Sequence, residues 1–487
     1  MSVHWPIIRT LLAHPSRIAT VDDRGSRRSI EILVAALHIA SHLEATCKSP
    51  TVGVLLPTGS AFPIAALGAW MIGKTVVPLN YLLKKEELQY VVDDCGTDTI
   101  LTAGAMLDFM GGGPKVGRLV KMEELSFAGF PEPRWPATPS DEELALLLYT
   151  SGTSGRPKGV MLTHGNISAN IRQIRSFIQF TSKDVMLGVL PQFHTFGLTA
   201  LTLLPLAAGM KVVYSSRFVP NRIVRLIREQ RPTILIAIPS MYGALLSVKD
   251  AVPDDFASLR YIVSGGEPLS DSVAARFLER FGKVINEGYG LTETSPATNW
   301  CRPDEHKPHS VGRPLPEIDE RIVDLNTLHD VGRNVDGEVW IKGPNIMRGY
   351  YHMPEETAKA LTPEGYFRTG DIGRIDDQGH LYITGRLKEM LIVGGENVFP
   401  REIEEVLDSH PDVNASGVIG IHDPMRGELP LAFVEMREGH TFDKASIVAH
   451  CRGRLAGYKV PTDVRLLSAL PRNPTGKVMR RELKALI

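Results

Sequence analysis

One short stretch of the chain has the residue types that suit binding of a polyphosphate. Residues 149–159 read YTSGTSGRPKG, so hydroxyls, glycines and Lys158 lie close together directly after an apolar run at residues 144–148. Glycines let the backbone approach a ligand closely, and exposed N–H groups, hydroxyls and a lysine can hold phosphate oxygens. The Walker A spacing cannot be laid on this stretch. An ordinary glycine- and serine-rich surface loop remains open as the alternative at this point.

Three further loops fit the same picture. Residues 191–198 (PQFHTFGL), 264–268 (SGGEP) and 287–294 (EGYGLTET) each accompany an apolar run that resembles a strand. Ligands of open parallel sheets gather at loops that follow the carboxyl ends of strands. We therefore expect one cleft that is shared by these loops and residues 149–159.

Alternating strands and helices must position these loops. The pattern predicts helices at residues 29–46, 61–72 and 82–94, and strands at residues 51–56, 75–79, 98–102, 185–190, 211–214, 233–238 and 261–264. Such alternation favours parallel βαβ units that are covered by helices. Proline-rich residues 131–139 are expected to be a linker.

From about residue 310 onward, the alternating pattern of strands and helices gives way to short strands and turns. Residues 338–342 and the turn-rich residues 365–383 predict a subdomain of short strands, and residues 385–390 are a candidate hinge. Beyond them, helices are expected at residues 400–407 and 444–455, and strands at residues 415–421 and 431–435. These elements would form a compact α+β unit of about 100 residues.

Composition limits the class of protein. The chain has 487 residues, of which 43% are hydrophobic, and a formal net charge of −1, so we expect more than one core and no nucleic-acid partner. Four scattered cysteines favour neither disulfides nor zinc and fit a reducing cytoplasm. There is no signal pattern, and the longest apolar tracts are too short for a membrane helix. A cytoplasmic location is expected, with peripheral membrane association left open.

Five motifs follow one another along the chain: residues 150–159 (TSGTSGRPKG), 289–294 (YGLTET), 366–371 (YFRTGD), 385–388 (GRLK) with 394–397 (GGEN), and 471–477 (PRNPTGK). In this order they resemble the motifs of the acyl- and aryl-CoA synthetases of the adenylate-forming (AMP-binding) superfamily. The resemblance implies that a carboxylate attacks the α-phosphate of ATP to give acyl-AMP and pyrophosphate, and that CoA then takes the acyl group. It also implies an α/β fold with a large N-terminal domain of parallel-rich sheets and helices over residues 1–385, which includes a β-rich subdomain at about 310–385. A small mobile α+β domain would cover residues 386–487, with its hinge near Lys388.

The resemblance implies an ATP site. Its residues would be Thr150, Ser151, Gly152, Thr153, Ser154, Gly155, Lys158, Gly266, Glu267, Pro268, Tyr289, Gly290, Thr292, Asp371 and Arg386. The first loop would hold the β- and γ-phosphates, and the ring of Tyr289 would face adenine. Asp371 is expected in a turn, where it could accept both ribose hydroxyls with Arg386 nearby. A buried structural role for Tyr289 and a plain interdomain salt bridge for Arg386 are the alternatives.

The catalytic assignments also come from the resemblance. Glu293 would hold Mg²⁺, a hard cation that prefers oxygen ligands, and Thr292 would donate to the α-phosphate. Lys477 would bridge the carboxylate and α-phosphate oxygens as negative charge concentrates between them. Lys388 would be the hinge for domain rotation. Because Glu293 and Lys477 are both present, a non-catalytic nucleotide-sensing relative is disfavoured.

The remaining assignments concern CoA and the acid. Gly394 and Gly395 would leave room for the pantetheine arm, since side chains there would block a narrow tunnel. The acid would lie against His194, Gly265, Gly290 and Ser295. A structural role for His194 is the alternative.

Several choices stay open at this stage. The acid site has apolar walls and no placed charge, which favours a medium- or long-chain fatty acid over an amino acid. An aryl acid is the alternative substrate, and an acyl carrier protein in trans is the alternative acceptor. A stand-alone adenylation enzyme and a luciferase-like oxygenase are further alternatives. Either a monomer or a homodimer is expected.

Overall fold

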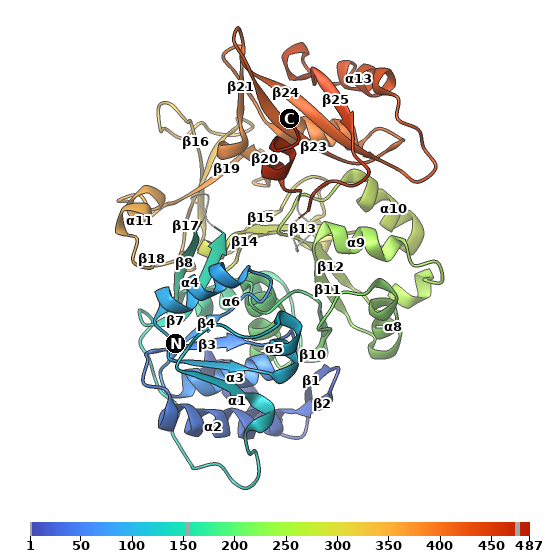
Figure 1. Ribbon diagram of the computed structural model, residues 1–487. Coiled ribbons are helices and arrows are strands. Elements are labelled where there is room, and N and C mark those ends of the chain that lie inside the picture. Colours follow the sequence, from blue (N-terminus) through green and yellow to red (C-terminus); the bar gives the residue numbers. More distant parts are fainter. Residues whose placement is uncertain (1, 152–155, 473–477) are drawn as a thin grey trace.

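A computed structural model describes residues 2–151, 156–472 and 478–487 of the chain. Figure 1 shows a large body that holds the N-terminal and central segments, with a smaller C-terminal unit (orange to red) packed above it. The fold is α/β, as expected. Its sheets carry the loops that the sequence singled out.

The first sheet has seven strands and contains the residue 149–159 stretch. In spatial order its strands are β18 (Gly349–Tyr350), β8 (Pro157–Thr163), β7 (Leu144–Ser151), β4 (Thr75–Pro78), β3 (Thr51–Leu55), β5 (Thr99–Thr102) and β6 (Arg118–Lys121). Strands β7, β4, β3, β5 and β6 run parallel, whereas β8 and β18 pair antiparallel.

The second sheet has nine strands. They are β15 (Arg313–Pro314), β14 (Ala297–Trp300), β13 (Asn286–Gly290), β12 (Tyr261–Ser264), β11 (Ile234–Ala237), β9 (Val185–Gly188), β10 (Lys211–Tyr214), β1 (Ile18–Asp22) and β2 (Gly25–Arg28). Strands β9, β11, β12 and β13 are parallel neighbours. Their carboxyl ends therefore meet at one edge, where residues 191–198, 264–268 and 291–294 follow.

Two smaller sheets complete the chain. The four-stranded sheet is made of β16 (Asp319–Val323), β17 (Gly337–Lys342), β19 (Phe367–Ile375) and β20 (Leu381–Arg386). The sheet of the C-terminal unit is made of β22 (Glu396–Val398), β21 (Leu391–Val393), β24 (Gly427–Met436), β23 (Val413–Asp423) and β25 (Asp463–Leu466). Both are mainly antiparallel, which fits the change of texture near residue 310.

Helices cover the two large sheets and the C-terminal sheet. They are α1 (His4–Ala13), α2 (Ser29–Thr46), α3 (Ala61–Met71), α4 (Lys85–Cys95), α5 (Gly104–Met110), α6 (His164–Phe177), α7 (Leu204–Ala207), α8 (Pro220–Gln230), α9 (Pro239–Leu246), α10 (Asp271–Phe281), α11 (Pro354–Ala360), α12 (Pro400–Asp408), α13 (Lys444–Arg452) and α14 (Arg480–Lys484). A π-helical segment, η2 (Phe196–Leu203), leads into α7.

Local sequence explains how individual helices form and pack. Helix α8 begins at Pro220, whose fixed φ suits a first helical position, and turns Ile223, Val224 and Ile227 inward. Helix α3 is buried along nearly its whole length. Its Gly68 lets α2 approach, since an added Cβ would lie 2.6 Å from the side chain of Ile39.

The hydrophobic interior is divided along the sequence. One large core cluster extends up to Leu381, and the buried clusters of the C-terminal unit begin at Leu391. The division lies beside the segment at residues 385–390 that the sequence marked as a candidate hinge.

Three sequence expectations about local structure are wrong. Residues 149–159 are not one long loop, because Tyr149 to Ser151 extend β7 and Pro157 to Gly159 begin β8, where they pair in antiparallel register. Residues 287–290, expected in a loop, belong to β13. Asp371 does not lie in a turn but inside β19, next to Gly370 at φ 68°. In all three places the backbone hydrogen bonds of a neighbouring strand outweigh the loop character of small and polar residues.

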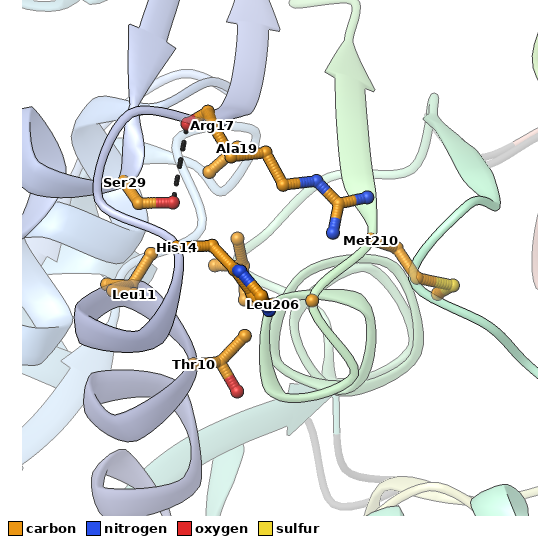
Figure 2. A pocket seen from close by; sticks show the side chains of 9 residues that line it. Thr10, Leu11, His14, Arg17, Ala19, Ser29, Leu206 and Met210 are labelled. Carbon is orange, nitrogen blue, oxygen red and sulfur yellow. Dashed lines mark hydrogen bonds between the residues drawn. The ribbon is translucent and has the colours of Figure 1, made fainter.

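Two other features of the body lie outside the predicted site. A small cavity between α1, β1 and α7 is lined by Thr10, His14, Arg17 and Ser29 among others and shares no residue with the predicted site (Figure 2).

Within the described part of the chain, no helix combines the length and the apolar character that a membrane crossing requires.

Candidate active site

Lys158 lies in β8, close to Tyr350, which in turn contacts Glu293. Thr150 lies opposite Lys158 in the ladder, whereas Gly152, Thr153, Ser154 and Gly155 lie outside the described residues. The Lys158 ammonium forms an ion pair with Glu356 of α11 and lies 5.4 Å from the ring centre of Tyr350. Strand β18 delivers Tyr350 because it pairs antiparallel with β8.

Glu293 lies in a helical turn, η4 (Thr292–Thr294), directly after β13. Its carboxylate accepts a 2.9 Å hydrogen bond from the Tyr350 phenol, and burial raises the pKa of Glu293 above its usual range. The hydroxyl of Thr195 donates to that of Thr292 at 3.2 Å. Residues from three separate parts of the sequence therefore meet at this turn.

A second cluster joins Tyr289, Asp371 and Arg386. The Asp371 carboxylate accepts from the Tyr289 phenol at 2.7 Å and lies 2.7 Å from Nε of Arg386, with only 2% of its side chain exposed. Burial raises the pKa of Tyr289 well above its usual range, and the nearby Asp371 charge raises that of Arg386. The salt bridge weighed for Arg386 is present, and it joins two residues of the predicted ATP site.

The predicted acid-binding residues lie beside these clusters. Gly265 lies against Phe196, where an added Cβ would be 3.0 Å from the ring, and Gly290 lies against the Pro296 carbonyl. Burial lowers the pKa of His194 to about 4, so its imidazole is neutral at neutral pH.

The remaining predicted residues near Gly265 and Gly290 lie in two segments, at Ser295 and at residues 266–268. Ser295 is buried, and its hydroxyl donates to the Asn345 carbonyl at 2.8 Å. Gly266 has φ 81° and is followed by Glu267 and the exposed Pro268, all in the loop after β12. Both segments border the Tyr289 strand.

The structure keeps some predicted residues apart from the clusters. Gly394 and Gly395 form the exposed turn between β21 and β22, with φ 61° and 91°, and Figure 1 shows β21 well away from β13. Lys388 is exposed in a helical turn, η6 (Leu387–Glu389), which follows β20. Lys477 lies outside the described residues.

Sequence reasoning missed Tyr350 and Glu356. Both belong to the stretch GYYHMPEET, residues 349–357, which contacts Glu293 and Lys158. A proline followed by two acidic residues is typical of the start of a helix, so the sequence at residues 354–356 could have predicted α11. The ion pair between Lys158 in β8 and Glu356 in α11 could not be predicted, because it depends on the antiparallel pairing of β18 with β8.

Comparison with known proteins shows which family the chain resembles. The model of the AMP-binding enzyme family matches residues 9–351, and that of its C-terminal domain matches residues 402–477. A long-chain-fatty-acid–CoA ligase of Bacillus subtilis is 32% identical over 93% of this chain and 89% of its own length. A feruloyl-CoA synthase of an Amycolatopsis species is 32% identical over 99% of this chain and 98% of its own.

A solved structure agrees over the full length. The ATP-bound MatB of Rhodopseudomonas palustris superposes with a TM-score of 0.91 at 30% identity, covering 100% of this chain and 99% of that one. The family model covers well over half of the chain. The chain therefore belongs to the AMP-binding enzyme family and is an AMP-forming acyl-CoA synthetase that uses ATP and CoA.

Proposed function

We propose that this ligase activates a medium- or long-chain fatty acid as acyl-AMP and transfers the acyl group to CoA. The observation that carries the proposal is the character of the acid side of the site. Phe196 lies against Gly265, the remaining residues of its helical segment η2 are buried, and His194 is neutral. A neutral, apolar wall favours a hydrocarbon tail, because an ammonium or a second carboxylate buried there would need a charged partner.

The aromatic side chains beside His194 support the same conclusion. Aromatic rings continue from Phe193 to Tyr81 at 4.7 Å and from Tyr81 to the exposed Phe109 at 6.3 Å. Arg217 stacks on Phe109 at 5.3 Å, at the outer end of this row, and its charge also acts on the Tyr81 phenol. The rings of Phe193 and Tyr81 extend the apolar surface beside His194.

The nucleotide would be held by residues from several loops. Lys158 and the loop that begins at Thr150 would bind the β- and γ-phosphates, and Thr292 would donate to the α-phosphate. Asp371 would accept the ribose hydroxyls. Its bonds to Tyr289 and Arg386 would hold the carboxylate in place for this role.

A magnesium ion fits the donor set around Glu293. The described residues contain no group of three or more His, Cys, Asp or Glu side chains that could hold a metal by themselves. Magnesium is commonly held by one or two carboxylates together with substrate phosphates and water, and Glu293 supplies one buried carboxylate. When bound, the ion would neutralise charge on the departing pyrophosphate.

The first half-reaction forms a mixed anhydride. A carboxylate oxygen of the acid bonds to the α-phosphorus, and the bond from that phosphorus to the pyrophosphate oxygen breaks. Negative charge concentrates between the two reactants, where Lys477 would be positioned by the motif at residues 471–477. This assignment rests on the motif alone.

The second half-reaction would need a different arrangement of the C-terminal unit. The CoA sulfur bonds to the acyl carbon, the bond to AMP breaks, and the thiol proton passes to solvent. Gly394 and Gly395 lie on a turn away from β13, so a rotation near Lys388 would bring them to the acyl-AMP. The separate cores on either side of residues 385–390 support domains at residues 1–385 and 386–487.

An aryl acid is the second candidate substrate. The row of aromatic rings at Phe193 and Tyr81 would suit stacking, and the feruloyl-CoA synthase relative matches nearly the whole chain. The acceptor is proposed to be CoA, with a carrier protein in trans as the alternative. A cytoplasmic location and a monomer or homodimer are part of the same proposal.

The test is pyrophosphate release from a panel of saturated fatty acids and substituted benzoates, with and without CoA. Acyl-CoA formation is followed by mass spectrometry, and a Glu293→Gln preparation excludes contaminating ligases. Preferential turnover of fatty acids of medium or long chain is expected. Turnover of benzoates with no fatty-acid activity would contradict the substrate assignment, and a requirement for acyl carrier protein in place of CoA would contradict the acceptor.

A further inference from the structure

Lys158 already has an anionic partner within the protein. Its ammonium pairs with one carboxylate oxygen of Glu356, while the other oxygen lies 2.9 Å from Nζ of Lys359. The Lys158 side chain is 14% exposed and Glu356 is 37% exposed, so this pair is partly shielded from solvent. Glu356 thus bridges an inner and an outer lysine.

The helix that carries Glu356 is anchored to the strand beside Lys158. The hydroxyl of Thr357, the next residue, accepts a 2.9 Å hydrogen bond from the backbone N–H of Tyr350 in β18. Strand β18 in turn pairs with β8, which carries Lys158. The carboxylate is therefore kept within reach of Lys158 by backbone structure, and its approach does not depend on a free loop.

Glu356 remains charged under working conditions. Hydrogen bonds from Lys158 and Lys359 lower the pKa of Glu356 to about 2. A permanent carboxylate on the phosphate-binding lysine opposes a polyphosphate in two ways. It occupies the ammonium, and it repels the negative phosphate oxygens.

We propose that Glu356 competes with the polyphosphate for Lys158 and thereby promotes release of pyrophosphate after acyl-AMP has formed. This inference rests on the proposed role of Lys158 in phosphate binding. Lys359 makes the exchange inexpensive, because the displaced carboxylate keeps one cationic partner. When pyrophosphate loosens, Glu356 pairs again with Lys158 and opposes rebinding.

The test compares pyrophosphate as a product inhibitor of the wild type and of Glu356→Gln. Glutamine keeps the size of the side chain and removes its charge. Because partly exposed ion pairs are weak, the inhibition constant for pyrophosphate is expected to fall about fivefold, and the KM for ATP to fall in parallel. The difference should shrink as salt is raised.

Two further variants serve as a matched control and as a test of the opposite effect. Glu355→Gln removes the neighbouring carboxylate of the same helix, which is exposed, and should leave pyrophosphate inhibition unchanged. Lys359→Ala removes the outer partner, so Glu356 is left to Lys158 alone and pyrophosphate inhibition should weaken about twofold. Melting temperatures within a few degrees of wild type establish that each variant is folded.

The outcomes separate this inference from the proposed role of Lys158. Weaker or unchanged pyrophosphate inhibition in Glu356→Gln would overturn the competition and would leave Glu356 as an orienting partner or a bystander. Lys158→Ala tests the underlying role by itself, because it should weaken pyrophosphate inhibition at least tenfold through loss of a charged partner. Unchanged inhibition in Lys158→Ala would remove the phosphate role and this inference with it.

Discussion

Nε of Arg386 lies 2.7 Å from Oδ1 of Asp371, and these two residues face each other across strands β19 and β20. The ion pair is set by strand register, because opposite residues of an antiparallel pair bring their side chains together. Strand β20 ends at Arg386, and Lys388 follows two residues later. The proposed ribose acceptor and the proposed hinge are thus connected through one cross-strand pair.

Asp371→Asn is predicted to weaken ATP binding. The variant loses the charge that pairs with Arg386 and that we propose accepts the ribose hydroxyls, and a hydrogen bond to a charged group contributes about 1.5–3 kcal/mol. The KM for ATP in pyrophosphate release should therefore rise at least tenfold. Asp376→Asn is the matched control, because it removes a carboxylate that pairs with Lys307 at 2.5 Å in the same β-rich part of the chain. An equal rise in both variants would contradict a ribose contact.

Tyr350→Phe is predicted to raise the Mg²⁺ concentration needed for half-maximal adenylation. The variant removes only the hydroxyl that donates to Glu293 at 2.9 Å, a bond worth about 1 kcal/mol, so a shift of about fivefold is expected. A magnesium titration at saturating ATP measures it. Tyr351→Phe, the neighbouring phenol, serves as the control and should behave as wild type. Identical titrations for Tyr350→Phe and wild type would show that the hydroxyl does not orient the carboxylate.

The fold was largely predictable wherever local pattern decides structure. The helix at residues 29–46 and the strands at residues 211–214 and 261–264 have the predicted bounds. The prediction failed at Tyr149 to Ser151 and Pro157 to Gly159, which pair with each other as parts of β7 and β8. Hydrogen bonding to a neighbouring strand is a property of the assembled sheet, and periodicity in a single segment does not contain it.

The sequence predicted which residues belong to the candidate site better than it predicted which contacts they make. The motifs named Tyr289, Asp371 and Arg386, and the structure brings these three residues together. The partners of Glu293 and Lys158 could not be read from spacing, since Tyr350 and Glu356 lie far from both along the chain. Their contacts depend on the register of β18 against β8.

Gly265→Ala is predicted to impair use of the acid more than use of ATP. Its new Cβ would lie 3.0 Å from Cζ of Phe196, closer than ordinary contact, so the ring, which we propose borders the acid, must give by a few tenths of an ångström. The kcat/KM for a long-chain acid should fall about tenfold, with the KM for ATP nearly unchanged. Adding Phe196→Leu to this variant should restore part of the loss. A double variant as poor as Gly265→Ala would argue against this contact as the cause.

Glu320→Gln is predicted to stabilise the protein at alkaline pH. Burial raises the pKa of Glu320 from its ordinary 4.5 to about 8, with Asp319 adding to the shift and Asn299 and Arg333 opposing it. Below pH 4.5 folded and unfolded chains both hold the proton. Between pH 4.5 and pH 8 only the unfolded chain releases it, so the free energy of unfolding falls as pH rises.

A neutral glutamine removes that loss. At pH 8 the free energy of unfolding of Glu320→Gln should exceed that of wild type by an amount on the order of 2 kcal/mol, and its melting temperature should be higher. Near pH 4.5 the two proteins should have nearly the same melting temperature. Glu317→Gln, an exposed carboxylate paired with Arg172, is the control and should change little at either pH. A constant difference between Glu320→Gln and wild type across this range would contradict a raised pKa.

The path of oxygen from the acid tests the central claim most directly. A fatty acid labelled with ¹⁸O in its carboxylate is incubated with ATP, Mg²⁺ and CoA, and the AMP is analysed by mass spectrometry. Because the carboxylate oxygen bonds to the α-phosphorus and remains there when the thiol displaces AMP, each AMP should carry one ¹⁸O while pyrophosphate carries none. Unlabelled AMP, or label in inorganic phosphate together with ADP, would contradict activation of the acid as an acyl-adenylate.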